Sequence, residues 1–198
     1  MSALQNRSDG DVPTSASVAA SAGMGAVAAA LGYLLTYLII ADEVRDVIRE
    51  DVADWKGVAW YFYNGHLVDI QVGGSIGDFG GSGTVDFIAQ SGSTNAELLY
   101  LIPPIVLVAI GGLLAYHLGT ADLGQAVFVG APIAIGYAVV MVAGALVAEA
   151  STEATFVGIE VTGSMAPALL PALILAGIIY PVVFGTVGAM LVTLLATR

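Results

Sequence analysis

Four long runs without a charged side chain constrain what this chain can fold into. The runs cover residues 18–41, 98–118, 125–148 and 164–196, and none contains Asp, Glu, Lys or Arg. About 20 apolar residues in an α-helix cross the ~30 Å hydrocarbon layer of a bilayer, so each run is long enough to span it. We therefore expect an all-α membrane protein built as a bundle of four transmembrane helices.

The polar remainder divides the chain into a tail, an insert and connections. Residues 1–17 are small and polar without periodicity, which is typical of a disordered tail. Residues 18–198 are then a single membrane domain that carries an extramembrane insert at 42–97. The segment 119–124 is short enough to make the second and third runs antiparallel neighbours, and 149–163 is predicted to be an acidic loop.

Within the insert, the spacing of apolar residues changes from helical to extended. Between residues 42 and 63 they recur three or four apart, which predicts an amphipathic helix that lies in the interface or continues the first span. Asp42 and Arg45 form an i,i+3 pair on its wet face. After His66 the period becomes two, which predicts a β-hairpin-like pair of strands joined by a flexible glycine-rich loop at 73–83.

The fourth run is too long for one straight span and too short for two. It also contains Pro167, Pro171 and Pro181, so we expect one kinked, overlong helix, or a helix preceded by a short interfacial segment. Membrane orientation stays open, because one side of the membrane would carry two basic residues and the other side three, which is too small a difference to decide it.

Charge restricts the class of protein further. The chain has 16 Asp and Glu against 5 Lys and Arg, with a formal net charge of −11. Such a balance argues against nucleic-acid binding and favours a halophilic archaeon, because concentrated salt screens repulsion between surface carboxylates. With no cysteine, the chain has no disulfides and no Cys-based metal site. No cofactor or metal is indicated.

The stretch WKGVAWYFYNGHLVDI at residues 55–70 concentrates the candidate functional residues. Its Trp and Tyr side chains are typical of an interfacial belt, beside which Lys56 can snorkel. We interpret the stretch as a membrane anchor and as a joint between the helix and the hairpin. The candidate functional or interfacial residues here are Trp55, Trp60, Tyr61, Tyr63, Asn64 and His66.

Two other constellations have weaker chemical interpretations. Glu149 ends the third run on the same side as several other carboxylates, which is compatible with a cation vestibule. Residues 162–171 (TGSMAPALLP) resemble the serine box of type I signal peptidases, in which Ser164 would need Lys56 or His66 as its base. Because an apolar run follows instead of a β-rich domain, we expect Ser164 to cap the fourth helix and predict no enzyme activity, with a membrane serine protease as the alternative.

Residues 55–70, followed by LLYLIPPIVLVAIGGLLAYHLG, also resemble a family of haloarchaeal membrane proteins of unknown function, some of them labelled transporters. The resemblance covers roughly residues 40–198, with Gly65 in place of an alanine in the family's aromatic motif. It implies a multi-pass plasma-membrane protein and transfers no catalytic or binding residues.

We therefore predict a structural or interaction component of the membrane, whose partners are the lipid bilayer and either further copies of the chain or other membrane proteins. The alternative is a small transporter or channel subunit. Prolines within the runs would suit broken transporter helices, but no charged residue accompanies them inside the runs.

Overall fold

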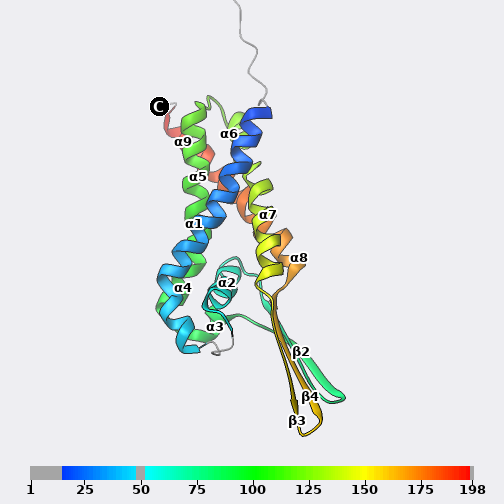
Figure 1. Cartoon of the computed structure of the whole chain (residues 1–198). Helices are drawn as coiled ribbons and strands as arrows, with labels where there is room; N and C mark the ends of the chain where they lie inside the picture. Colours follow the sequence, from blue (N-terminus) through cyan, green and yellow to red (C-terminus); the bar gives the residue numbers. More distant parts are fainter. Residues whose placement is uncertain (1–14, 48–51, 197–198) are drawn as a thin grey trace, which may run out of the picture.

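The computed structural model describes residues 15–47 and 52–196 (Figure 1). The predicted tail at 1–17 lies outside the described residues except for 15–17, which begin the first helix. The described residues fold into a bundle of long helices with a narrow sheet projecting from one end. The start of α1 and the end of α9 lie at the opposite end of the bundle.

Four stretches of helix among the described residues are long and apolar enough to cross a membrane: Ser15–Asp46, Thr94–Leu118, Leu123–Val147 and Leu169–Ala196. Each of them overlaps one of the four charge-free runs. Their elements are α1 (Ser15–Val47); α4 (Thr94–Leu98), η1 (Leu99–Leu101) and α5 (Ile102–Leu118); α6 (Leu123–Gly130) and α7 (Ile133–Val147); and α8 (Leu169–Pro171), η2 (Ala172–Ile179), η3 (Pro181–Gly185) and α9 (Thr186–Ala196).

Glycines bring these helices into backbone contact. A Cβ on Gly136 of α7 would lie 1.8 Å from the carbonyl oxygen of Ala22 in α1. A Cβ on Gly188 of α9 would lie 2.0 Å from the carbonyl oxygen of Val108 in α5. Only glycine fits at such positions, so the small residues of the runs produce a tightly packed bundle.

Prolines shape the third and fourth helical stretches. Pro132 separates α6 from α7, because its ring nitrogen cannot donate the next helical hydrogen bond. The segments η2 and η3 are π-helical, with hydrogen bonds that reach five residues back, and Pro181 opens the second of them. The fourth stretch is thus a single helix with widened turns, and it begins at Leu169 rather than at residue 164.

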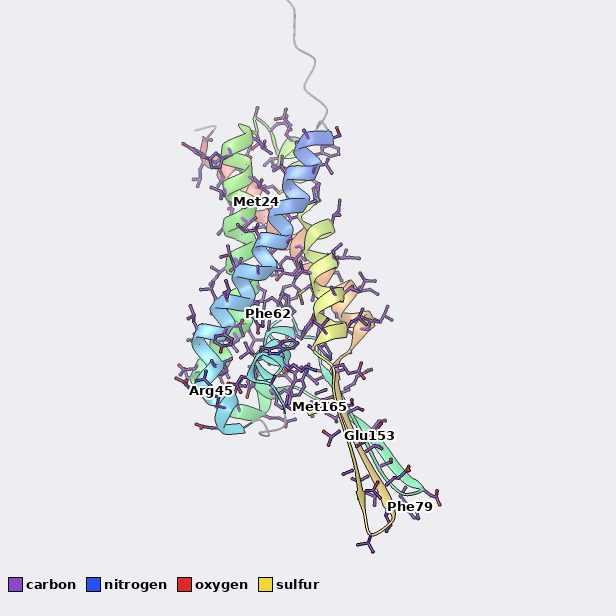
Figure 2. All side chains as sticks on the ribbon, in the orientation of Figure 1. Met24, Arg45, Phe62, Phe79, Glu153 and Met165 are labelled. Carbon is purple, nitrogen blue, oxygen red and sulfur yellow. The ribbon has the colours of Figure 1, made fainter. Side chains whose placement is uncertain are left out.

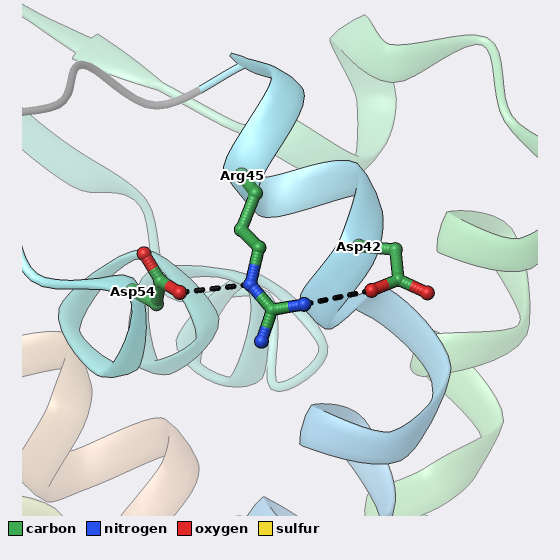
Figure 3. A network of polar contacts seen from close by, with 3 residues as sticks. All are labelled: Asp42, Arg45 and Asp54. Carbon is green, nitrogen blue, oxygen red and sulfur yellow. Dashed lines mark hydrogen bonds and ion pairs between the residues drawn. The ribbon is translucent and has the colours of Figure 1, made fainter.

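The insert does not contain the single amphipathic helix predicted for residues 42–63. Residues 42–47 complete α1, the backbone at Ala53 is extended, and α2 (Asp54–Asn64) is a separate helix packed back against α1. Arg45 joins the two elements: it donates to Asp42, as predicted, at 2.8 Å and to Asp54 at 2.9 Å (Figure 3). Both contacts are solvent-exposed and add little stability, and only the contact with Asp54 connects α1 to α2.

A four-stranded antiparallel sheet corrects the all-α expectation. In the described part of the chain its order is β2-β1-β4-β3, formed by β1 (Ile70–Ile76), β2 (Phe79–Val85), β3 (Ala150–Phe156) and β4 (Ile159–Pro167). The first hairpin was predicted. The second occupies the segment predicted as an acidic loop, and Ser164 lies within β4 instead of capping a helix. A single hairpin is marginal in water, whereas pairing β1 with β4 makes a sheet wide enough to persist.

The prediction of a flexible glycine loop at 73–83 was also wrong. Most of these residues lie within β1 and β2, and the chain reverses at Gly77, which has φ of 58°. Glycine is unfavourable inside a strand, but β1 is hydrogen-bonded on both sides and is held in register from Ile70 to Ile76.

Candidate functional site

One face of α2 binds α7 and the two residues that follow it through a row of polar side-chain atoms. Lys56 donates to the carbonyl oxygen of Glu149, Trp60 donates to that of Ala148 at 3.0 Å, and Tyr63 donates to that of Met141. His66 completes the row through the hydroxyl of Tyr137. The four side chains are spaced four, three and three residues apart, which places them on one helix face and its extension.

The hydrogen bonds of His66 fix its tautomer. Nδ1 lies 2.8 Å from the carbonyl oxygen of Phe62, which can only accept, so Nδ1 carries the proton. Complete burial lowers the pKa of His66 to about 4 and keeps the ring neutral near pH 7. Nε2 is therefore an acceptor, and the Tyr137 hydroxyl donates to it at 2.7 Å. Both ring nitrogens are thereby used within the fold.

Asn64 holds the chain as it leaves α2. Its side-chain amide donates to the carbonyl oxygen of Val68 at 3.0 Å, and its side-chain carbonyl accepts from the backbone N–H of Phe87 at 2.9 Å. Phe87 begins α3 (Phe87–Ser91), so one buried side chain connects the segments that enter and leave the first hairpin.

The aromatic side chains do not form the surface belt that was predicted. Trp60, Tyr61 and Tyr63 are buried within the protein, with Trp60 stacked on Phe87 at 5.9 Å between ring centroids. Burial raises the pKa of Tyr61 to about 12. Trp55 alone of the four predicted belt residues is substantially exposed, at 42%, with the Lys56 ammonium 5.6 Å from its ring centroid. The interpretation of the stretch as a joint describes this geometry better than that of an anchor.

The joint formed by α2 and α7 fixes the base of the sheet. Lys56 and Trp60 bind the last carbonyls before β3, and Asn64 binds the last turn before β1. The backbone N–H of Ala168 donates to the carbonyl oxygen of Asp69, which ties the end of β4 to the start of β1. Both hairpins therefore start from restrained positions, and the sheet projects in a defined direction (Figure 1).

Strand register gives the projecting sheet two different faces. Ile76 pairs with Phe79 and Val161, and Val72 pairs with Met165, so these apolar side chains share one face. We call this the apolar face. Neighbouring residues alternate to the other side, where the hydroxyls of Ser75 and Thr162 are 2.8 Å apart. That polar face carries Thr84, Gln71, Ser82, Ser164, Ser151, Ser75, Thr162, Glu153, Thr155 and Glu160.

A cavity of about 650 Å³ lies where the polar face meets the bundle, lined by Gln71, Ser82, Thr84, Leu146, Glu149 and Ser164 among others. It brings together two residues considered separately in the sequence, Glu149 and Ser164. Among the described residues, no three of His, Cys, Asp and Glu gather closely enough to hold a metal ion. Lys56 and His66 bind other groups, so the geometry provides Ser164 with neither of its two predicted bases.

Comparison with protein families matches residues 1–196 to a family described as "Family of unknown function (DUF7978)". The chain belongs to this family. Neither the curated proteins nor the solved structures give a significant match.

Sequence reasoning missed Tyr137 and the second hairpin of this DUF7978 chain. Tyr137 had a recognisable signal: a hydroxyl within a charge-free run needs a buried partner, and only a few polar side chains of the insert could supply one. The hairpin at 150–167 had a weaker signal, because Glu153 and Glu160 sit among small residues and suggest a solvated loop.

Proposed function

We propose that the chain is a multi-pass plasma-membrane protein of a halophilic archaeon that acts as an interaction component, with the projecting sheet as its contact surface. The exposed apolar end of the sheet carries this proposal. Phe79 is 86% exposed and lies at the end of the sheet far from the helices (Figure 2). Ile76, which pairs with Phe79 across the first hairpin, is 62% exposed. Grouped apolar side chains on a projection outside the helical bundle favour a binding role.

The backbone at the second turn supports the same function. Val157 has φ of 52° and is 85% exposed. A β-branched residue is strained in this left-handed region, and an exposed side chain gains little packing within the fold to offset that strain. An exposed apolar side chain at this strained position is compatible with a contact between Val157 and another molecule.

The joint supports a positioning role for the bundle. A binding surface on a long projection is useful only if its direction is defined, because a freely moving sheet loses more entropy when it binds. The buried side chains of α2 supply this definition at the base of both hairpins. The acidic balance of the chain supports a salt-rich surrounding.

The experiment compares native membrane complexes of two variants of equal charge. Ile76→Asp with Phe79→Asp places carboxylates on the apolar face, and Ser75→Asp with Ser82→Asp places them on the polar face. We expect blue-native electrophoresis of gently solubilised membranes to show a complex for the wild type and the polar-face variant. The apolar-face variant should migrate as the uncomplexed chain. A complex that survives both pairs of substitutions rules out this function.

A small transporter or channel is the second candidate. The break between α6 and α7 and the π-helical turns of the fourth stretch favour it, because interrupted helices often line transport pathways. Proteoliposomes loaded with a pH-sensitive or sodium-sensitive dye test it: a flux above that of empty liposomes is expected for a carrier of either ion. Flux equal to empty liposomes for both ions rejects such a carrier.

A further inference from the structure

The apolar face differs from the rest of this acidic chain in its charge. The strand residues on this face include no Asp, Glu, Lys or Arg, whereas Glu153 and Glu160 belong to the polar face. The chain as a whole has a net charge of −11. Two copies that approach through their acidic surfaces repel each other, and the strand residues of the apolar face add no charge to this repulsion.

A row of glycines crosses the middle of this face. Gly81, Gly74 and Gly163 are paired with one another across three strands, so the surface there is bare backbone. A Cβ at Gly81 or Gly163 would meet nothing within 4 Å, so packing within the fold does not require glycine at these two positions. Bare backbone within a sheet is typical of places where another backbone or a ligand approaches closely.

Two grooves include residues of this glycine row. One, of about 410 Å³, is lined by Val72, Met165, Ala150 and Val161 among others. Another, of about 440 Å³, lies between Ile76, Phe79 and Val161 near the far end of the sheet. Side chains from a facing sheet can enter such grooves, as in the packing of two sheets about 10 Å apart.

A second copy in the same membrane presents the same face at the same height. The joint holds the sheet in a fixed position and direction relative to the bundle. In two copies inserted in the same direction, Ile76 and Val161 therefore lie at the same height relative to the membrane. A two-fold axis perpendicular to the membrane relates two such copies. Because β1 and β4 are the central strands, this axis sets β1 of each copy opposite β4 of the other, with Ile76 near Val161.

We infer that two copies of this chain pair side by side in one membrane through the apolar faces of their projecting sheets. The pairing buries the exposed side chains of Ile76 and Phe79 and leaves the carboxylates of Glu153 and Glu160 on the outer surfaces. This inference rests on the proposed function and names the partner of the contact surface.

Cross-linking of the purified full-length chain in liposomes tests the pairing. The chain has no cysteine, so Ile76→Cys and Ser75→Cys each introduce a single thiol, on the apolar and polar face respectively. With a bifunctional maleimide of about 10 Å, matched to the spacing of packed sheets, we expect a covalent dimer from Ile76→Cys at a yield roughly tenfold above Ser75→Cys. Equal yields from the two variants, or no dimer from either, overturn the inference.

Energy transfer between fluorophore-labelled copies gives an independent measurement. Ile76→Asp with Phe79→Asp should weaken self-association by at least about tenfold, whereas Ser75→Asp with Ser82→Asp should leave it unchanged. If purified copies do not associate but the native complex still requires the apolar face, self-pairing is wrong and the interaction role stands. If the native complex ignores the apolar face, the proposed function itself is wrong.

Discussion

The Nε2 atom of His66 and the hydroxyl of Tyr137 are joined by a 2.7 Å hydrogen bond although the two residues are 71 positions apart in the chain. His66 follows the end of α2, and Tyr137 lies within a helix long and apolar enough to cross a membrane. This bond attaches the aromatic insert to the bundle from the inside.

Replacement of Tyr137 by phenylalanine removes the hydroxyl that donates to His66 and leaves Nε2 buried without that donor. We expect the free energy of unfolding to fall by about 1–3 kcal/mol, the usual cost of an unsatisfied buried acceptor. Thermal unfolding in detergent measures the change. Tyr116→Phe is the control, because Tyr116 is 73% exposed. Equal midpoints for the two variants would show that the bond contributes nothing.

Stability should depend on pH through His66. Its pKa is about 4 in the folded protein and about 6.5 when unfolded, so between these values the unfolded chain binds the additional proton. The stabilisation is complete above pH 6.5 and is lost as the pH falls towards 4, by about 3 kcal/mol in total. Unfolding midpoints across this range should drop less steeply for His66→Gln than for the wild type. A slope for His66→Gln parallel to that of the wild type contradicts the prediction.

Gly136 and Gly23 provide a matched pair for helix packing. A Cβ at Gly136 would lie 1.8 Å from the Ala22 carbonyl oxygen, whereas one at Gly23 of α1 would meet nothing within 4 Å. Gly136→Ala must separate α7 from α1, with an expected loss of at least about 2 kcal/mol. Gly23→Ala should be neutral or stabilising, by up to about 1 kcal/mol. The thermal midpoint of each purified variant decides, and a midpoint for Gly136→Ala at or above that of Gly23→Ala refutes this packing.

Val157→Asn should stabilise the second hairpin. Val157 and Gly158 have φ values of 52° and 79°, and an Asn-Gly pair suits a turn with two positive φ angles. Relief of the strain at Val157 should raise the free energy of unfolding by about 1 kcal/mol. Gly158→Ala is the opposing control, because it puts a Cβ at a positive φ and should destabilise. Denaturation of both variants measures the two effects, and a loss of stability in Val157→Asn would show that the turn is unstrained.

The helical part of the fold could be read from the sequence because its signal is local. A run such as 98–118 carries the whole evidence for a spanning helix within itself, and a helix satisfies its own backbone groups. The first hairpin was also predictable, since alternation around Val72 and a glycine turn are adjacent in the chain.

The second hairpin depends on distant contacts, which the sequence does not show. Ser75 and Thr162 share a face although they are 87 residues apart. Glu153 predicts a solvent-exposed segment, but a solvated loop and an exposed strand have the same local sequence pattern. Only pairing with β1 distinguishes them.

The sequence predicted which residues form the candidate site, but it predicted their arrangement only in part. Amphipathic side chains such as Trp60 and Tyr63 suit a membrane interface and a hydrogen-bonded core equally well, because both surroundings offer an apolar and a polar side. Their partners are the backbone carbonyls of Met141 in α7 and of Ala148 directly after it, and backbone carbonyls have no sequence signature. Burial of α2 therefore could not be inferred without the fold.

The π-helical turns between Ala172 and Gly185 affect how well the length of the fourth helical stretch matches the thickness of a bilayer. A wider turn holds more residues for the same advance along the axis, so the fourth stretch is shorter than its 28 residues would be as an α-helix. As an α-helix the segment would be longer than the hydrocarbon layer is thick. The π-helical turns bring its length closer to that thickness without requiring it to tilt. In a bilayer, the pitch of this one helix would absorb hydrophobic mismatch, and the surrounding lipid would be less deformed.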